Sequence, residues 1–200
     1  HYPVDEHTLL AVEALGKLPG MDGGAVGRCL REALENLADP YILVMAILFH
    51  DLGKAVGEVH AAESVVRSRL ICRRIGLPEE DAERIAFLVE HHMLMNNISQ
   101  FRDIDDEDIL VQFADTIKTE QRLRALFLLS FCDLYAVGPN VWSDWKGALL
   151  LQLYLRTVKR LLGRVESHDE EYWNSPKADA IREAIPSTMQ EQVESHLKGL

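Results

Sequence analysis

Long apolar runs, paired cysteines and an excess of basic charge are all missing from this sequence, and each absence excludes a class of protein. The apolar stretches are far shorter than the roughly 20 residues that a membrane span needs, so we expect no contact with a membrane. Cys29, Cys72 and Cys132 are widely spaced, which argues against a thiolate zinc site or a disulfide framework. The 32 acidic residues outnumber the 21 lysines and arginines, whereas nucleic-acid binding requires a basic surface. The first residues do not resemble a signal peptide, so we predict a cytoplasmic protein.

Helical patterning is what the sequence has in abundance. Hydrophobic residues make up 48% of the 200 residues, which is enough for one core. Residues 18–27 contain Pro19 and four glycines and are expected to form a loop. The spacing of apolar residues predicts helices over residues 5–17, 28–38, 59–75, 78–95, 103–117, 119–137 and 143–165. The sequence therefore predicts an all-α fold.

Residues 41–49 form a run that is apolar on every face. Asp39 suits a helix N-cap, and Pro40 suits the first helical position. A buried strand is the alternative for so short a run, but its Met, Ala and Leu content favours a helix. We expect a central, fully buried helix here.

The last part of the chain differs from the rest. Residues 166–200 are polar and contain Pro176 and Pro186. We therefore predict one domain over residues 1–165, followed by a peripheral helical appendage or linker over residues 166–200.

The first candidate site residues are His50 and Asp51, which end the apolar run. A carboxylate at the end of a buried helix is costly unless it is paired or binds a metal. The negative end of the helix dipole makes an anion there still less favourable. A bound cation would resolve both problems, and Lys54 follows three residues later.

Two adjacent histidines lie in the predicted helix over residues 78–95. His92 extends the apolar stripe of Ile85, Leu88 and Val89, so its side chain is expected to point inward. His91 lies about 100° away around the helix, so its direction is less well defined. The pattern favours His92 as a site residue and keeps His91 as the alternative.

Three further residues complete the set of candidates. Asp133 is the only charged residue in an apolar run, His7 shares a face with apolar residues, and His60 begins a predicted helix. Imidazoles and carboxylates together suit a divalent metal such as Mn, Fe or Zn, and this many ligands allow two ions. The candidate ligands are His7, His50, Asp51, His60, His91, His92 and Asp133.

Each candidate also has an ordinary structural explanation. A lone inward histidine is more often a hydrogen-bonded core residue than a ligand. Asp133 would also suit an ion pair with Arg122 or Arg124. The combination of residues favours a metal site over these structural explanations, because a buried His-Asp pair, inward histidines and one buried aspartate later in the chain occur together.

These residues resemble the HD superfamily of metal-dependent phosphohydrolases, in which a first His, a His-Asp pair and a final Asp occur in this order. The string HDLGK at residues 50–54 is similar to its signature. The segments VDEHTL, LVEHHMLM, RDI and WSDWK, at residues 4–9, 88–95, 102–104 and 142–146, resemble the HD domain of bacterial PII uridylyltransferase/uridylyl-removing enzymes.

The resemblance implies an HD-type helical bundle with a metal site between its central helices. It implies one or two divalent ions (Mn, Fe, Zn or Mg), catalytic roles for Asp51 and Lys54, and removal of UMP from a tyrosine of a uridylylated PII-type protein. Two alternatives stay open: a generic HD nucleotidase or phosphodiesterase acting on a small nucleotide, and a non-catalytic metal-binding regulatory module. Members of this family commonly have a Gly-rich stretch after the lysine. This chain departs from that pattern, with Ala55 and Val56 directly after Lys54.

Overall fold

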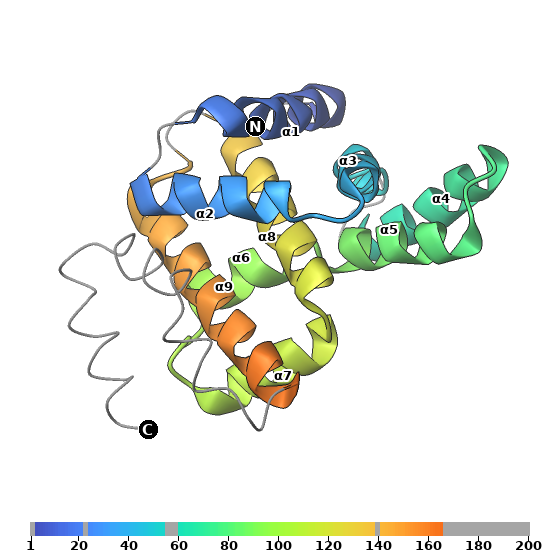
Figure 1. The fold of residues 1–200 in the computed structure, drawn as a ribbon. Helices are drawn as coiled ribbons and strands as arrows, with labels where there is room; N and C mark the ends of the chain where they lie inside the picture. Colours follow the sequence, from blue (N-terminus) through green and yellow to red (C-terminus); the bar gives the residue numbers. More distant parts are fainter. Residues whose placement is uncertain (1–2, 22–23, 55–59, 139–140, 166–200) are drawn as a thin grey trace.

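The computed structural model describes residues 3–21, 24–54, 60–138 and 141–165 of the chain. Within these residues the chain forms nine α-helices, one short 3-10 helix and no β-strand, which confirms the predicted all-α fold (Figure 1). In chain order the elements are α1 (Val4–Lys17), η1 (Leu18–Gly20), α2 (Gly24–Glu35), α3 (Pro40–Phe49), α4 (His60–Arg74), α5 (Glu79–His91), α6 (Leu94–Phe101), α7 (Glu107–Ile117), α8 (Glu120–Ala136) and α9 (Asp144–Val165).

Helix α8 lies at the centre of the fold. It begins at the N-cap Thr119, whose side chain accepts a hydrogen bond from the backbone N–H of Arg122. All residues from 125 to 132 are buried, so the helix is surrounded by protein over about two turns. It contacts α1, α2, α3, α5, α6, α7 and α9. Asp133 follows directly on this buried segment.

The run at residues 41–49 is a helix, as predicted, but it is not fully buried. Tyr41 is 44% exposed because its hydroxyl donates a hydrogen bond to the Asp81 carboxylate, 2.7 Å away. Asp39 occupies the N-cap position without a capping hydrogen bond, since its carboxylate pairs with Arg84 of α5 at 2.7 Å. These contacts link the start of α3 to α5.

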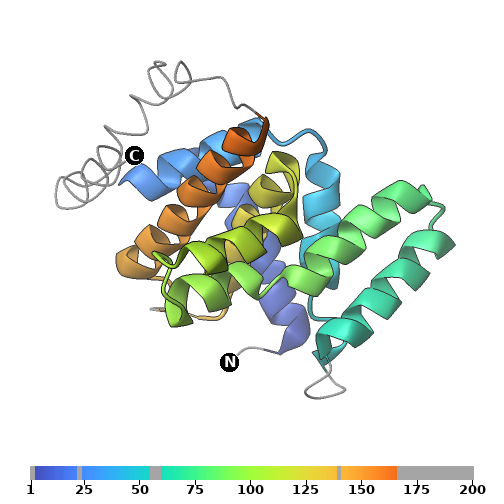
Figure 2. The same ribbon diagram turned by 90° about the horizontal axis from the view of Figure 1, so that it is seen from below.

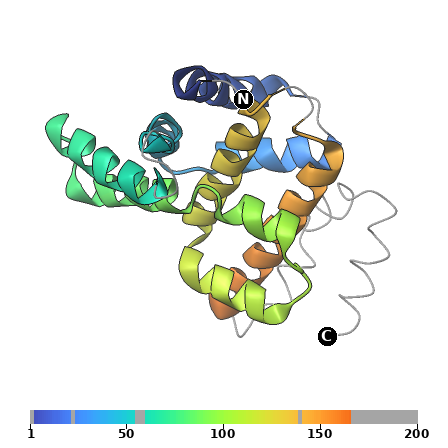
Figure 3. The same cartoon turned by 180° about the vertical axis from the view of Figure 1, so that it is seen from behind.

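Helices α4 and α5 pack side by side and extend away from the other helices, as Figures 2 and 3 show. Gly76 lies between them with a φ of 77°, a conformation that favours glycine. The guanidinium of Arg69 joins the two helices through two hydrogen bonds of 2.7 Å to Glu83. Helix α5 also packs against α3.

Two predicted boundaries are wrong. The expected loop over residues 18–27 contains a 3-10 helix, and α2 begins at Gly24 rather than at Arg28. The expected helix over residues 78–95 ends at His91, and α6 begins at Leu94. At this break the His92 ring bonds to the Val89 carbonyl, which competes with the backbone hydrogen bond of the next turn.

The predicted appendage over residues 166–200 lies outside the described residues, so the division at residue 165 stays a prediction. Among the described helices, none combines the length and the apolar character needed to cross a membrane.

Candidate metal centre

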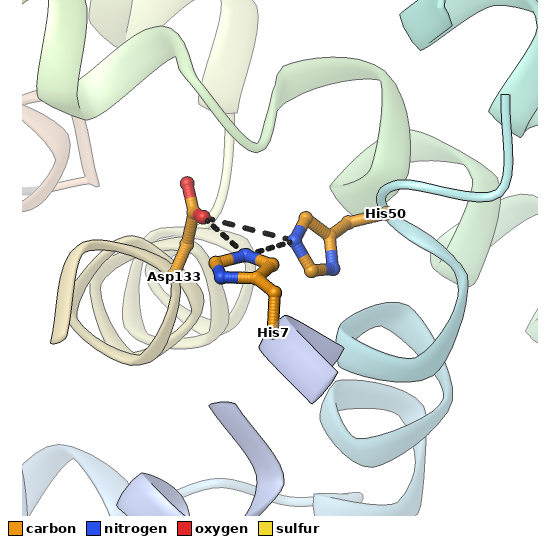
Figure 4. A group of neighbouring side chains, drawn as sticks. All are labelled: His7, His50 and Asp133. Atoms are coloured by element: carbon orange, nitrogen blue, oxygen red, sulfur yellow. Dashed lines mark hydrogen bonds and ion pairs between the residues drawn. The ribbon is translucent and has the colours of Figure 1, made fainter. Parts of the chain in front are cut away.

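Three side chains from distant parts of the sequence meet at one point between α1, α3 and α8 (Figure 4). His7 belongs to α1, His50 follows the last residue of α3, and Asp133 belongs to α8. The Nε2 atom of His7 lies 3.2 Å from Nε2 of His50 and 3.0 Å from Oδ1 of Asp133. His50 Nε2 lies 3.7 Å from the same carboxylate oxygen. Three potential ligand atoms therefore face one another.

Asp51 contributes a second carboxylate at the edge of this cluster. Its Oδ2 atom lies 3.6 Å from His50 Nε2 and 3.8 Å from His7 Nε2. The same oxygen accepts a hydrogen bond of 2.5 Å from the ammonium group of Lys54. The Gly53 N–H donates to the buried Ser64 hydroxyl at 2.8 Å, which fixes the turn between Asp51 and Lys54.

His92 lies on the other side of His50, with a distance of 5.2 Å between the ring centroids. Its Nδ1 lies 2.7 Å from the Val89 carbonyl oxygen, and His50 Nδ1 lies 2.7 Å from the Ile47 carbonyl oxygen. Because a carbonyl oxygen only accepts, both Nδ1 atoms must carry the proton. In the neutral ring, Nε2 then carries the lone pair that a metal-binding imidazole needs.

The other two predicted ligands are not part of this cluster as described. His91 packs its ring against Phe87, with centroids 4.5 Å apart, and is only partly buried. The geometry therefore favours His92 over His91 as a candidate ligand. His60 is the first residue of α4, but its side chain lies outside the described part of the chain.

Burial and charge determine the protonation of the cluster. Burial alone would raise the pKa of the Asp133 carboxyl, but its contacts with His50 and His7 hold that pKa well below the usual range. Burial alone would lower the pKa of His50, yet Asp133 and Asp51 raise it above its ordinary value. Burial and the nearby His50 lower the pKa of His92. Asp133 is therefore an anion at neutral pH, as a metal ligand must be.

The spacing of the ligand atoms fits a shared divalent ion. Ligands at about 2.1 Å from one ion lie roughly 3.0 to 3.4 Å apart in tetrahedral or octahedral geometry. The observed separations are 3.0, 3.2 and 3.7 Å, close to that range. The mixed imidazole and carboxylate donors suit Mn, Fe or Zn.

The site opens toward Asp133 and Lys54. The His7 and His50 side chains are 6% and 0% exposed, whereas those of Asp133 and Lys54 are 18% and 50% exposed. Asp133 and Lys54 are therefore the members of the site that solvent reaches most easily. The sequence did not predict that the Ile47 and Val89 carbonyls orient His50 and His92. Its only sign is that each carbonyl lies three residues before the histidine.

Comparisons with known proteins support the assignment of the chain to the HD domain family. The HD domain family matches residues 4–120, which include His7, His50, Asp51 and His92, while Asp133 lies beyond the matched segment. A bifunctional uridylyltransferase/uridylyl-removing enzyme of Burkholderia thailandensis is 34% identical over 170 residues, which cover 84% of this chain and 20% of that protein. Enzymes with the same name from Ralstonia nicotianae and Cupriavidus pinatubonensis are each 35% identical, over 81% and 84% of this chain and 19% of their own length.

The chain thus spans about a fifth of the length of the curated relatives it matches. The family match covers more than half of the chain, and the described helices have the all-α architecture that the resemblance implied. The chain belongs to the HD domain family, the metal-dependent phosphohydrolases that its sequence resembles.

Proposed function

We propose that this chain hydrolyses a phosphodiester and that its substrate is a uridylylated protein of the PII type. One observation carries the proposal of hydrolysis. His7, His50 and Asp133 come from three helices and place their ligand atoms within 3.7 Å of one another in a largely buried site. Such a convergence of acid and imidazole groups is costly without a cation to share.

The proposed chemistry divides between the ion and the chain. A divalent ion, when bound, activates a water molecule as the nucleophile and neutralises charge on the phosphoryl oxygens. His7, His50 and Asp133 hold that ion, with Asp51 within reach as a further ligand. His92, whose Nδ1 faces the Val89 carbonyl and whose Nε2 can therefore serve as the ligand atom, is the candidate for a second ion or for orienting water.

Lys54 is proposed to bind the phosphate group. Its ammonium group pairs with the buried Asp51 carboxylate, yet half of its side chain is exposed. A lysine acts as a point charge on phosphate, and here that charge lies on the open side of the site. Asp51 thus has two proposed roles, since it contacts both the ligand cluster and the phosphate-binding lysine.

The relatives support the choice of substrate. They are named for uridylyl removal, and they match more than four fifths of this chain. In a uridylylated tyrosine the leaving group is a phenolate, whose conjugate acid has a pKa of about 10. Such a leaving group departs without a strong general acid, and the described site supplies none besides its histidines.

The experiment is release of UMP from uridylylated PII protein by the purified chain with Mn²⁺. We expect release that Asp51→Ala abolishes, while Asp144→Ala, at an exposed carboxylate that begins α9, leaves it unchanged. Hydrolysis of small nucleotides or diesters without UMP release would favour the generic phosphodiesterase. Bound metal without turnover of any substrate would favour the non-catalytic module.

A further inference from the structure

Helices α6 and α8 meet at a polar contact close to the candidate metal centre. The side-chain amide of Asn96 donates a hydrogen bond to the Ser130 carbonyl oxygen, 3.2 Å away. Asn96 is 8% exposed and Ser130 is fully buried. Within the described part of the chain, Asn96 Oδ1 and Ser130 Oγ are the buried side-chain oxygens that have no hydrogen-bond partner.

This contact is not an efficient way to join two helices. A buried oxygen without a partner disfavours the folded state, whereas apolar side chains at the same place would pack without that penalty. Apolar residues flank both positions, since Met95, Leu129 and Phe131 are buried in the core. Polar groups that weaken a core are typical of positions retained for function.

The position of the contact indicates which function it serves. Asn96 lies four residues after His92, and the backbone of His92 and Met93 keeps right-handed helical angles across the break. Ser130 lies three residues before Asp133 on α8. Residues three or four apart share a helix face, so the contact joins the turn after His92 to the turn before Asp133.

We propose that Asn96 and Ser130 are positioning residues of the metal centre, which set the separation between His92 and Asp133. The proposal rests on the metal-dependent function proposed above. Their effect passes through the hydrogen bond from Asn96 to the Ser130 backbone carbonyl and through the helices that carry His92 and Asp133. A metal site requires its ligands to be held closely, and partners outside the ligand set typically determine that precision.

The test compares Asn96→Leu and Asn96→Ala with the unchanged chain, because both variants remove the side-chain amide that bonds to the Ser130 backbone carbonyl. Two quantities are measured: the Mn²⁺ dissociation constant by calorimetry, and the free energy of unfolding of the metal-free chain by urea titration. We expect Mn²⁺ binding to weaken about tenfold. Asn96→Leu should keep its stability, because the variant also removes a buried oxygen that has no partner.

Ser99→Ala is the matched control. Ser99 is also a buried residue of α6, but its hydroxyl bonds locally to the Asn96 carbonyl at 3.3 Å and does not reach α8. Its loss should leave Mn²⁺ affinity unchanged. If Asn96→Leu does not fold, Asn96→Ala, which removes the same amide and leaves a smaller side chain, decides the question.

Unchanged Mn²⁺ affinity in a folded Asn96→Leu or Asn96→Ala variant would overturn the proposal. So would a loss of affinity that merely parallels a loss of stability, since a purely structural contact produces that result. The two proposals fail in different ways. A wild-type chain that binds no Mn²⁺ would contradict the metal centre and this inference with it, whereas wild-type binding that the variants do not alter contradicts this inference alone.

Discussion

His50 and His92 end their helices in nearly the same conformation, with φ and ψ of −57° and −34° for His50 and −54° and −34° for His92. Each ring places Nδ1 2.7 Å from the carbonyl oxygen three residues earlier. The helix end itself therefore orients the ring and fixes the proton on Nδ1. Two helices from different parts of the chain thus deliver the same chemical group, an imidazole protonated on Nδ1, to one site.

The first prediction concerns the tautomer of His92 in the metal-free chain. Burial lowers the pKa of His92, so the ring should be neutral near pH 7 with its proton on Nδ1. Two-bond ¹H–¹⁵N correlation spectra of the histidine rings measure this directly. The proton on Nε2 instead would show that His92 is not prepared to bind a metal through that atom.

The second prediction concerns Lys54→Gln. The value of kcat/KM for an anionic phosphodiester should fall about 100-fold, as it does when one electrostatic group that stabilises a transition state is removed. Mn²⁺ affinity should be equal or higher, because Lys54 no longer competes for the Asp51 oxygen that lies 2.5 Å away. Steady-state kinetics at saturating Mn²⁺ and a metal titration separate the two effects.

Lys17→Gln is the control for Lys54→Gln. It removes an exposed lysine from α1, the helix that carries His7, where Lys17 pairs with Glu13 at 2.7 Å. It should change neither quantity. A parallel loss of kinetics and metal affinity in Lys54→Gln would instead mean that the lysine supports the ligand cluster and does not bind phosphate.

The third prediction is acid destabilisation of the metal-free chain through Asp133. Burial raises the pKa of this carboxyl, but contacts with His50 and His7 lower it further, to a folded value well below the usual one. A depressed pKa contributes stability that is fully present above the unfolded value of about 4 and is lost as pH falls toward the folded value. Urea titrations between about pH 6 and pH 3 should show this loss, and Asp133→Asn should show less of it. If the free energy of unfolding falls equally with pH in both proteins, Asp133 is not the cause of the acid destabilisation.

The fourth prediction concerns Gly147, near the start of α9. A Cβ atom there would lie 2.8 Å from the Trp142 ring, which itself packs edge-on against Phe131 at 4.9 Å. Gly147→Ala should therefore destabilise the chain by about 1 to 3 kcal/mol through overpacking. Gly163→Ala, on the same helix with no atom within 4 Å, should stabilise it by up to about 1 kcal/mol. Chemical denaturation of both variants measures the difference, and equal effects would show that Trp142 moves freely.

Much of the candidate site could be predicted from the sequence, because its polar residues occur in otherwise apolar segments. Asp133 is the only charge in the apolar run that ends α8, and Asp51 is a carboxylate at the end of another apolar run. The apolar stripe of the helix that ends at His91 also favoured His92 over His91, and the structure buries His92 while His91 stays partly exposed. A polar residue at a position where the helical pattern expects an apolar one can be recognised from a single sequence.

The rest depends on contacts that a single sequence does not encode locally. His7 and Asp133 lie 126 positions apart, and only the packing of α1 on α8 brings them to 3.0 Å. The break after His91 was missed because no proline or glycine marks it, and a side-chain bond to the Val89 carbonyl accompanies it. Asn96 and Ser130 gave no sequence signal, since a single polar residue in a helix is ordinary until its burial is known.

The central claim is that His7, His50 and Asp133 hold a divalent ion on which phosphodiester hydrolysis depends. The most direct measurement is hydrolysis of bis(4-nitrophenyl) phosphate by the purified chain before chelation, after chelation and after return of Mn²⁺. Asp133→Asn is measured beside it, with Glu80→Gln, at an exposed carboxylate of α5, as the control. The account predicts activity that chelation removes, Mn²⁺ restores and Asp133→Asn abolishes while helical content persists. Activity that survives both chelation and Asp133→Asn would contradict it.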